Sequence, residues 1–262
     1  TGTTIYSYTL TRDVGSRISG KSETIGGVTT AYVYTYDTAG RLKTVTKGGA
    51  AYSSYNYDSN SNRTSGVTAG TSFTATYDDQ DRLLTYNTNT YGYNANGELT
   101  SKQVGSATPT AYEYNQLGNL KKVTLPTSSV INYSLDGYQR RAIRQVGTSP
   151  REFYTHEGPL KVVGSLTEGV STSLKTFVFG VDGSSPEYIR YQGADLRVIK
   201  DHLGSVRLVV NAGTGAIVQR IDYNDIGGVT SDTNPGFQPY GFAGGMYAVS
   251  YTHLRAHETS LH

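Results

Sequence analysis

The feature that most constrains this chain is a short segment that recurs along it. Residues 34–45 read YTYDTAGRLKTV, and residues 112–123 read YEYNQLGNLKKV. Weaker copies of the same pattern begin at Tyr55, Ala75, Tyr91, Asn132 and Asp222. Most successive copies are roughly 16 to 25 residues apart, a period typical of proteins built from stacked structural repeats.

Each copy predicts a β-hairpin. Tyrosines alternate with small residues in residues 32–36 (YVYTY), so the three rings share one face of a strand. Asp37 and Gly40 then hold the first and fourth positions of a type I turn that ends in a left-handed residue. Residues 41–45 (RLKTV) form the predicted return strand. The Leu and the Val of this strand do not alternate strictly, which predicts a bulge between them.

The same reasoning assigns structural roles to the Tyr, Asp and Gly of every copy. The predicted repeat-motif positions are Tyr34, Tyr36, Asp37, Gly40, Tyr57, Asp58, Tyr77, Asp78, Tyr93, Gly97, Tyr114, Gly118 and Gly137. In the copy that begins at Ala75, Asp81 replaces the usual Gly. A single hairpin is marginal in water, so the copies must pair edge to edge. Helical periodicity is nearly absent, and the predicted fold is all-β, with antiparallel hairpins forming a curved or spiralling sheet.

Composition supports strands and excludes several partners. The chain has 23 Tyr and 31 Gly but six Phe, one Met and no Trp, so tyrosine must supply core bulk while its hydroxyl finds a partner. The formal net charge is only +2, which gives no electrostatic basis for binding nucleic acid. No cysteine occurs, which leaves the compartment open. No apolar run approaches the ~20 residues that predict membrane insertion.

The motif Tyr-x-Tyr-Asp-x-x-Gly-Arg-Leu resembles the YD repeats of the bacterial Rhs family, whose more distant relatives include toxin-complex C subunits and teneurins. Residues 201–207 (DHLGSVR), 220–224 (RIDYN) and 239–247 (PYGFAGGMY) are similar, in this order, to the Rhs-associated core. The core-motif positions that this resemblance singles out are Asp201, His202, Gly204, Ser205, Tyr240 and Gly241.

The resemblance implies a β-sheet shell that holds a covalently linked C-terminal toxin or effector and works with a delivery apparatus, secreted or at the cell surface. It implies a hairpin array in residues 1–150 and a core-like β segment in residues 151–247, continuous with the same sheet. The family's self-cleavage site lies beyond the matched core, so autoproteolysis is carried over to no residue. We predict no catalytic residue, cofactor or metal ligand.

Residues 248–262 differ from the rest of the chain. Three of its five histidines lie in the last ten residues, and the string VSYTHLRAHET resembles translated sequencing adaptor. We interpret this tail as non-native and both ends of the chain as truncations. Such a piece would expose strand edges, so we expect it to aggregate or to stay partly disordered when expressed alone.

Two motifs could suggest metals. His257 and His262 resemble the ligands of a zinc-protease motif, but five residues of a helix put the second imidazole roughly 140° away. Residues 58–62 (DSNSN) offer oxygen ligands like a calcium loop, but Arg63 stands where that loop needs Gly and Ala69 where it needs a carboxylate. A turn is the favoured interpretation of the second motif.

Two further motifs could suggest enzymes. Asp201, His202 and Ser205 have the residue types of a hydrolytic triad, but we expect the first two to lie on a strand and point to opposite faces. Residues 213–215 (GTG) could begin a dinucleotide-binding loop, but no third glycine and no helical pattern follow. We interpret residues 211–215 as a hairpin turn.

The basic cluster of Arg140, Arg141 and Arg144 beside Tyr138 could contact phosphate or a glycan. The favoured interpretation is that the arginine stems cover tyrosine rings while their heads are solvated or paired with carboxylates. The leading functional hypothesis is a non-catalytic structural fragment of a YD-repeat shell. The alternative is a carbohydrate-binding or adhesion module whose exposed tyrosines stack on sugars. A hydrolase ranks last.

Overall fold

The computed structural model describes residues 4–158, 161–181, 183 and 185–246. The predicted tail, including His257 and His262, lies outside the described residues. The chain divides into two compact units, Thr1–Thr88 (unit 1) and Asn89–His262 (unit 2). The predicted division after residue 150 stays a prediction.

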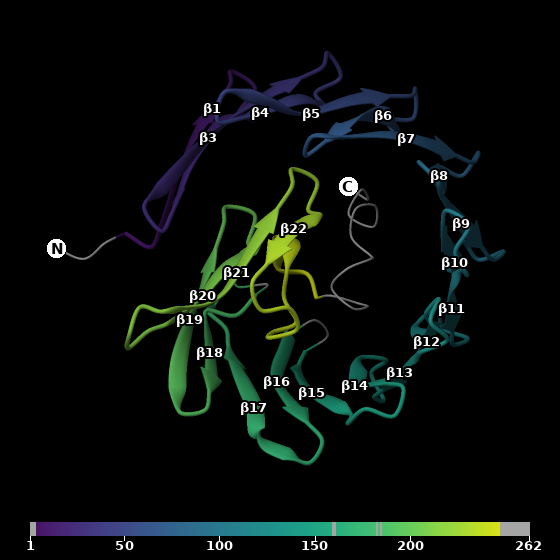
Figure 1. Cartoon of the computed structure of the whole chain (residues 1–262), viewed down its shortest axis with the longest axis vertical. Helices are drawn as coiled ribbons and strands as arrows, with labels where there is room; N and C mark the ends of the chain where they lie inside the picture. Colours follow the sequence, from purple (N-terminus) through teal and green to yellow (C-terminus); the bar gives the residue numbers. More distant parts are fainter. Residues whose placement is uncertain (1–3, 159–160, 182, 184, 247–262) are drawn as a thin grey trace. The chain divides into compact units, whose positions relative to one another are not determined.

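Unit 1 is a run of antiparallel strands in which each strand pairs with the next in chain order (Figure 1). Its strands are β1 (Tyr6–Arg12), β2 (Ile18–Ile25), β3 (Val28–Tyr36), β4 (Leu42–Lys47), β5 (Ala50–Tyr57), β6 (Arg63–Thr68), β7 (Thr71–Tyr77) and β8 (Leu83–Tyr86). The described residues of this unit supply no helix and no second layer, so each strand depends on its two neighbours.

Unit 2 has the same kind of antiparallel pairing, each strand with the next in chain order. Its strands are β9 (Asn89–Tyr93), β10 (Leu99–Val104), β11 (Thr110–Tyr114), β12 (Leu120–Thr124), β13 (Val130–Leu135), β14 (Arg141–Val146), β15 (Glu152–Glu157), β16 (Lys161–Thr167), β17 (Val170–Val178), β18 (Tyr188–Tyr191), β19 (Ala194–Lys200), β20 (Val206–Asn211), β21 (Ile217–Tyr223) and β22 (Val229–Asp232). One 3-10 turn, Phe242–Gly244, is the only helical element among the described residues, and none of them forms a helix that could cross a membrane. The predicted all-β hairpin fold is confirmed.

Two kinds of hairpin connection alternate from β1 to β7. The connections after β2, β4 and β6 are two-residue turns with positive φ at both residues, namely Gly26–Gly27, Gly48–Gly49 and Ala69–Gly70. Two left-handed residues are the mark of a type I′ turn, whose twist matches the flanking strands. The connections after odd-numbered strands are longer and begin with Asp. One end of the strands in unit 1 therefore carries Asp-led turns, and the other end carries two-residue turns.

The predicted turn and bulge both occur after β3. The backbone N–H of Gly40 donates to the carbonyl of Asp37 at 3.0 Å, and Gly40 has a φ of +82°. Across β3 and β4, Thr35 faces Thr44 while the next residue, Tyr36, faces Leu42. The residue between these two partners is the extra residue of a bulge, which lies within the predicted interval.

The tyrosines of β3 lie on one face of the sheet, as predicted. Tyr32, Tyr34 and Tyr36 are partly buried, whereas the residues between them are exposed. Lysine side chains cover this ring face: the Nζ atoms of Lys21 and Lys47, on the two neighbouring strands, lie 4.5 and 5.8 Å from the centre of the Tyr32 ring. Long cationic stems thus shield apolar area, while the ammonium of Lys21 also pairs with the buried Glu23 at 3.6 Å.

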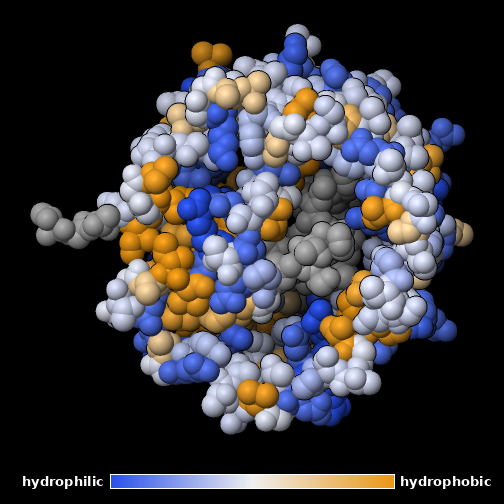
Figure 2. All heavy atoms as spheres, viewed as in Figure 1, coloured by the Kyte–Doolittle hydropathy of each residue, from blue (hydrophilic) through white to orange (hydrophobic). Residues whose placement is uncertain are grey.

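Unit 2 holds the largest buried cluster. Its apolar side chains come mainly from β16 to β21, and Figure 2 shows apolar residues gathered over β19 to β21. Residues 233–246 pack on this cluster and are here called the return segment. Tyr240 of the return segment is fully buried, and its ring meets those of Phe177 and Phe179 edge-on at 5.8 and 5.9 Å.

Tyr240 also supplies the hydrogen bonds that one residue of β16 does not make with β17. The β16–β17 pairing extends to Gly164 opposite Thr176, and Val162 lies beyond it. The Tyr240 hydroxyl accepts a hydrogen bond from the Val162 N–H at 2.8 Å and donates one to the Val162 carbonyl at 2.9 Å. A side chain 78 residues away therefore satisfies both backbone groups of one strand residue.

We expect Gly40→Val to destabilise the protein by about 1 to 3 kcal/mol, because a β-branched residue is strained at this positive φ. Ala39→Val is the matched control, since Ala39 is exposed and lies outside the left-handed region. Urea unfolding of both variants tests the assignment. Equal midpoints for Gly40→Val and the parent would contradict it.

Tyr240→Phe keeps the ring but leaves the N–H and carbonyl of Val162 without the hydroxyl. We expect a loss of about 1 to 3 kcal/mol in the free energy of unfolding, the penalty for an unsatisfied buried polar group. Tyr138→Phe is the control, because Tyr138 is 83% exposed. Similar melting temperatures for the two variants would show that the hydroxyl has no bridging role.

Candidate functional site

The Asp- and Asn-led turns form one recurring structure, here called the turn row. Its five-residue turns begin at Asp13, Asp37, Asp58, Asp78, Asn94, Asn115, Asp136, Asp201 and Asn224. In each, the Oδ1 atom of position one accepts the backbone N–H groups of positions three and five. A short side chain thereby satisfies two backbone donors of the turn that have no partner in the strand ladder.

In four of the Asp-led turns of the row, position five is an arginine that pairs with position one, whereas the turns led by Asp58 and Asp201 have Asn62 and Ser205 there. The arginines at position five each donate from Nε to the Oδ2 atom of their own position-one Asp, at 2.6 to 2.8 Å; they are Arg17, Arg41, Arg82 and Arg140. Where position one is the neutral Asn94 or Asn115, position five is Glu98 or Asn119 instead. No Asn-led turn therefore places an arginine beside a neutral amide.

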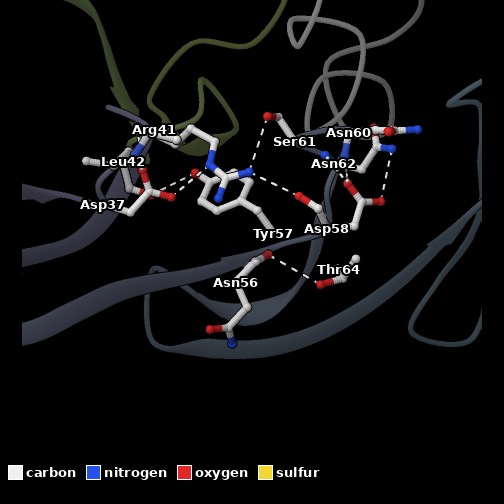
Figure 3. Close-up of polar contacts among 11 residues, drawn as sticks. Asp37, Arg41, Leu42, Asn56, Tyr57, Asp58, Asn60, Ser61, Asn62 and Thr64 are labelled. Atoms are coloured by element: carbon white, nitrogen blue, oxygen red, sulfur yellow. Dashed lines mark hydrogen bonds and ion pairs between the residues drawn. The ribbon is translucent and has the colours of Figure 1, made fainter.

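One turn is fastened to the next hairpin through the motif tyrosine (Figure 3). The guanidinium of Arg41 lies 4.4 Å from the centre of the Tyr57 ring, and the Tyr57 hydroxyl donates to the Leu42 carbonyl at 2.7 Å. Nη1 of Arg41 also donates to the Asp58 carbonyl at 3.1 Å and contacts Ser61 Oγ at 3.2 Å. We call this set of contacts the interlock.

Tyrosine hydroxyl contacts of the same kind recur along the chain. Tyr36, Tyr77 and Tyr223 each precede a turn and donate to the carbonyl of the first residue after the preceding turn in the row, at 2.7, 3.1 and 3.1 Å. Arg17 stacks on the Tyr36 ring at 4.5 Å, as Arg41 does on its tyrosine. The motif tyrosine is therefore a fastener between hairpins.

Three turns of the row have a residue other than glycine at position four that contacts the preceding turn. Ser61, Asp81 and Gln139 hold this position with φ values of +73°, +60° and +61°. The Asp81 carboxylate accepts a hydrogen bond from Asn62 of the preceding turn at 2.7 Å, and the Gln139 side chain accepts one from Asn119 at 3.3 Å. These contacts with the preceding turn offset the cost of a left-handed conformation.

Comparison with known proteins agrees with this arrangement. The family model described as the teneurin YD-shell matches residues 1–257. The chain belongs to this YD-shell family. The predicted resemblance to YD-repeat proteins is confirmed, and so is the coarse role it implies, that of a structural, shell-like module.

Curated relatives of this YD-shell chain are teneurins. Teneurin-1 of Gallus gallus is 30% identical over 226 residues, 83% of this chain and 8% of that protein. Teneurin-4 of Homo sapiens is 29% identical over 253 residues, 93% of this chain and 9% of that protein. The chain thus spans less than a tenth of the length of these relatives.

Solved structures similar to the chain come from Tc toxins. A crystal structure of TcdB2-TccC3 gives a TM-score of 0.44 at 13% identity and covers 91% of this chain and 18% of that one. The Photorhabdus luminescens Tc holotoxin pore gives a TM-score of 0.38 at 14% identity, with 91% and 18% covered.

The YD-motif positions lie on the strands and in the turns of the row. Tyr34, Tyr93 and Tyr114 lie on strands that lead into their turns, and Gly97 and Gly118 hold the left-handed position four with φ values of +84° and +78°. Gly137 differs, because it stands at position two of its turn. The left-handed residue there is Gln139, so the nearest glycine in the sequence was assigned in its place.

The enzyme-like motifs are structural parts of the YD array. Asp201, His202 and Gly204 lie in a turn of the row, so the expected placement of the first two on a strand is wrong. Ser205 ends that turn, and its Oγ accepts the Ala243 N–H at 3.0 Å. In the return segment, the Gly241 carbonyl accepts the N–H of Val206, the first residue of β20, at 3.2 Å. The core motifs therefore hold the return segment against β20.

The calcium-like motif at Asp58 is a turn of the row, as expected. Within the part of the chain that the structure describes, no group of three or more His, Asp or Glu side chains is placed to hold a metal ion. The segment after Asn211 is a hairpin turn between β20 and β21, also as expected.

The arginine cluster is arranged as the favoured interpretation predicts, with stems over tyrosine rings and one head paired with a carboxylate. The Arg140 and Arg141 guanidiniums lie 5.0 and 4.5 Å from the ring centres of Tyr138 and Tyr133, and Arg144 pairs with Glu152 at 3.0 Å.

Sequence reasoning missed the first turn of the row, which begins at Asp13, because no tyrosine pair precedes it. Its signal was an Asp followed four residues later by Arg, the spacing that Asp37 and Arg41 share.

We expect Tyr57→Phe to lower the free energy of unfolding by about 0.5 to 1.5 kcal/mol, since it removes the hydrogen bond to the Leu42 carbonyl. Tyr188→Phe is the control, because Tyr188 is exposed. Chemical denaturation of both variants is the measurement. A loss no larger than that of the control would show that the hydroxyl does not fasten the hairpins.

Hydrogen bonds from the Arg140 side chain and then from its backbone lower the pKa of Asp136 from 3.8 to about 2. A lowered folded-state pKa contributes stability that is complete above pH 3.8 and is lost as the pH falls towards 2. Asp136→Asn should therefore be less stable than the parent at pH 7, and the difference should shrink below pH 4. Asp79→Asn, at position two of another turn, is the control. A constant difference from pH 7 to pH 2 would contradict the role of the carboxylate.

Proposed function

We propose that this chain is a non-catalytic wall segment of a YD shell that, in the full-length protein, encloses a C-terminal toxin or effector. The observation that carries the proposal is the interlock: the polar groups of the repeat motif are used to fasten one hairpin to the next. Asp37 and Arg41 pair at 2.7 Å, and the Tyr57 hydroxyl bonds to backbone. A motif whose polar groups are used in this way in successive hairpins stabilises a continuous sheet.

The same contacts argue against a catalytic role for the motif. A general base or nucleophile needs a side chain that can reach substrate. Both carboxylate oxygens of Asp37 are engaged within its own turn, and those of Asp78 and Asp136 are engaged in the same way. The proposed shell needs no cofactor, and a secreted or cell-surface location is part of the proposal.

The alternative of a sugar-binding tyrosine row has less support. A row of stacking platforms requires open ring faces. Among the described tyrosines only Tyr8, Tyr138 and Tyr188 are exposed, while the tyrosines that precede the turns are partly buried and several hold backbone carbonyls. This distribution favours a wall over a glycan-binding surface.

Limited proteolysis of the full-length protein, with its C-terminal segment, tests the proposal. We expect the C-terminal segment to resist protease while the shell is intact, and to be cleaved faster when Tyr36, Tyr57 and Tyr77 are all changed to Phe, because three fasteners of the wall are lost. The control changes Tyr138 and Tyr188 to Phe. Rapid cleavage of the C-terminal segment in the unmodified protein would overturn the enclosing role.

A further inference from the structure

The strand ladder between β14 and β15 is short, and we call this interface the seam. The register joins the two strands through two residue pairs, Ile143 with Phe153 and Arg144 with Glu152. By contrast, β13 and β14 share five pairs, and β15 and β16 share six. A short ladder lowers the free energy that local opening of a sheet requires. The seam therefore has less backbone support than either of the two hairpins that it joins.

The seam also has only the arginine half of the interlock. Nη1 of Arg140 donates to the Gly158 carbonyl at 2.8 Å. Arg41 makes the same contact with the Asp58 carbonyl in the interlock of unit 1. The tyrosine half is replaced, because β15 ends in Glu157 where β3, β5 and β7 end in tyrosine. An ionised carboxylate has no proton to donate to the carbonyl that follows the preceding turn.

Charged side chains cross the seam instead. Arg144 on β14 pairs with Glu152 on β15 at 3.0 Å. Arg140, which reaches the carbonyl beyond β15, is itself oriented by Asp136, which accepts a hydrogen bond from its Nε at 2.7 Å. The seam therefore depends on guanidinium contacts and is sensitive to positive charge placed close to them.

His156 is the group that can bring such a charge. It is half-buried on β15 and faces the apolar Val162 on β16. Arg140, Arg141 and Asp136, from β14 and the turn before it, are the charged groups that act on it. Burial and then the charges of the two arginines lower the pKa of His156 from 6.5. Asp136 acts in the opposite direction, but the net effect is a lowered pKa.

The lowered pKa couples opening of the seam to acid. In the open state the imidazole of His156 would leave this environment and regain its ordinary pKa of 6.5, so the open state would bind a proton first as the pH falls. The stability that His156 contributes to the closed state is therefore complete above pH 6.5. It is lost as the pH falls through the lower closed-state pKa.

We propose that the seam is an acid-sensitive joint of the wall, at which protonation of His156 separates β14 from β15. The geometry that carries this inference is a two-pair ladder without the tyrosine fastener, crossed by arginine contacts beside an imidazole. Its consequence, an opening that exposes the cargo in acid, rests on the proposed shell function.

Hydrogen exchange of the full-length protein, followed by mass spectrometry at about pH 7.5 and about pH 5, tests the inference. After correction for the intrinsic pH dependence of exchange, we expect β14 and β15 to exchange about fivefold faster at the lower pH. The internal control is β10 with β11, because these strands also share two residue pairs but carry no histidine. His156→Gln should remove the acid response of the seam.

Three outcomes of the exchange measurement would overturn the proposal. They are unchanged protection of the seam in acid, an equal acid response of β10 and β11, and an acid response that persists in His156→Gln. The first two need no variant, so they do not depend on how a substitution folds.

A disulfide across the seam provides a second test. The chain has no cysteine, so Ile143→Cys with Phe153→Cys places one directly paired couple there. Directly opposite residues have Cα atoms about 4.5 to 5.5 Å apart, within the range of a disulfide. Ser101→Cys with Ala111→Cys, across β10 and β11, is the matched control.

Both oxidised variants and the parent, as full-length proteins, are then exposed to protease at about pH 5. We expect the C-terminal segment to be cleaved in the parent and in the control but to stay protected in the oxidised seam variant. Equal cleavage of the two variants, or protection of the parent, would refute opening of the wall at the seam. Rapid cleavage of the parent at about pH 7.5 would instead refute the enclosing role, while the exchange rates would still decide whether the seam responds to acid.

Discussion

A hydrogen bond from a tyrosine hydroxyl to a backbone carbonyl on the neighbouring strand, which belongs to the preceding hairpin, is the contact on which the rest of the structure depends. The described residues of unit 1 offer no second layer against which a sheet could bury its apolar face. Each hairpin must therefore hold the next one by its own side chains. The tyrosine before each turn can do this because its ring adds apolar contact area while its hydroxyl reaches across to the carbonyl that follows the previous turn.

The turn supplies the second half of the interlock. An Asp or Asn at position one fixes the backbone of the turn, and an Asp there also aims the arginine at position five towards the next tyrosine. Asn and Glu, Asn and Asn, Asp and Asn, or Asp and Ser at these two positions preserve the backbone hydrogen bonds of the turn without the Asp–Arg ion pair. The array therefore needs the side-chain oxygen at position one more than the ion pair.

The fold was predictable wherever its causes are local. Period-two tyrosines and an Asp-x-x-Gly turn give the hairpin at Asp37, and the irregular apolar spacing after Gly40 gives its bulge. Prediction was weaker where another side chain replaces a local signal. Gln139 takes a left-handed conformation with help from a neighbouring turn, so Gly137 seemed the better candidate. The motif at Asp201 looked like a strand because its tyrosine is missing.

The role of Tyr240 could not have been predicted from local patterns. Its hydroxyl fills a gap between β16 and β17 that exists only after these strands separate, and the two partners are 78 residues apart. The ion pair of Arg144 with Glu152 has the same origin, since register brings the two residues opposite one another on neighbouring strands. Such features depend on which strands pair and in which register, and local sequence patterns do not reveal this.

The central claim is that a turn and the tyrosine of the following hairpin stabilise each other, and a double-mutant cycle tests it most directly. The cycle combines Arg41→Met with Tyr57→Leu and measures the free energy of unfolding of the parent, both single variants and the double variant. The interlock predicts a coupling energy of about 0.5 to 2 kcal/mol, whereas Arg41→Met combined with Tyr188→Leu should be additive. Additive effects for Arg41 and Tyr57 as well would contradict the account.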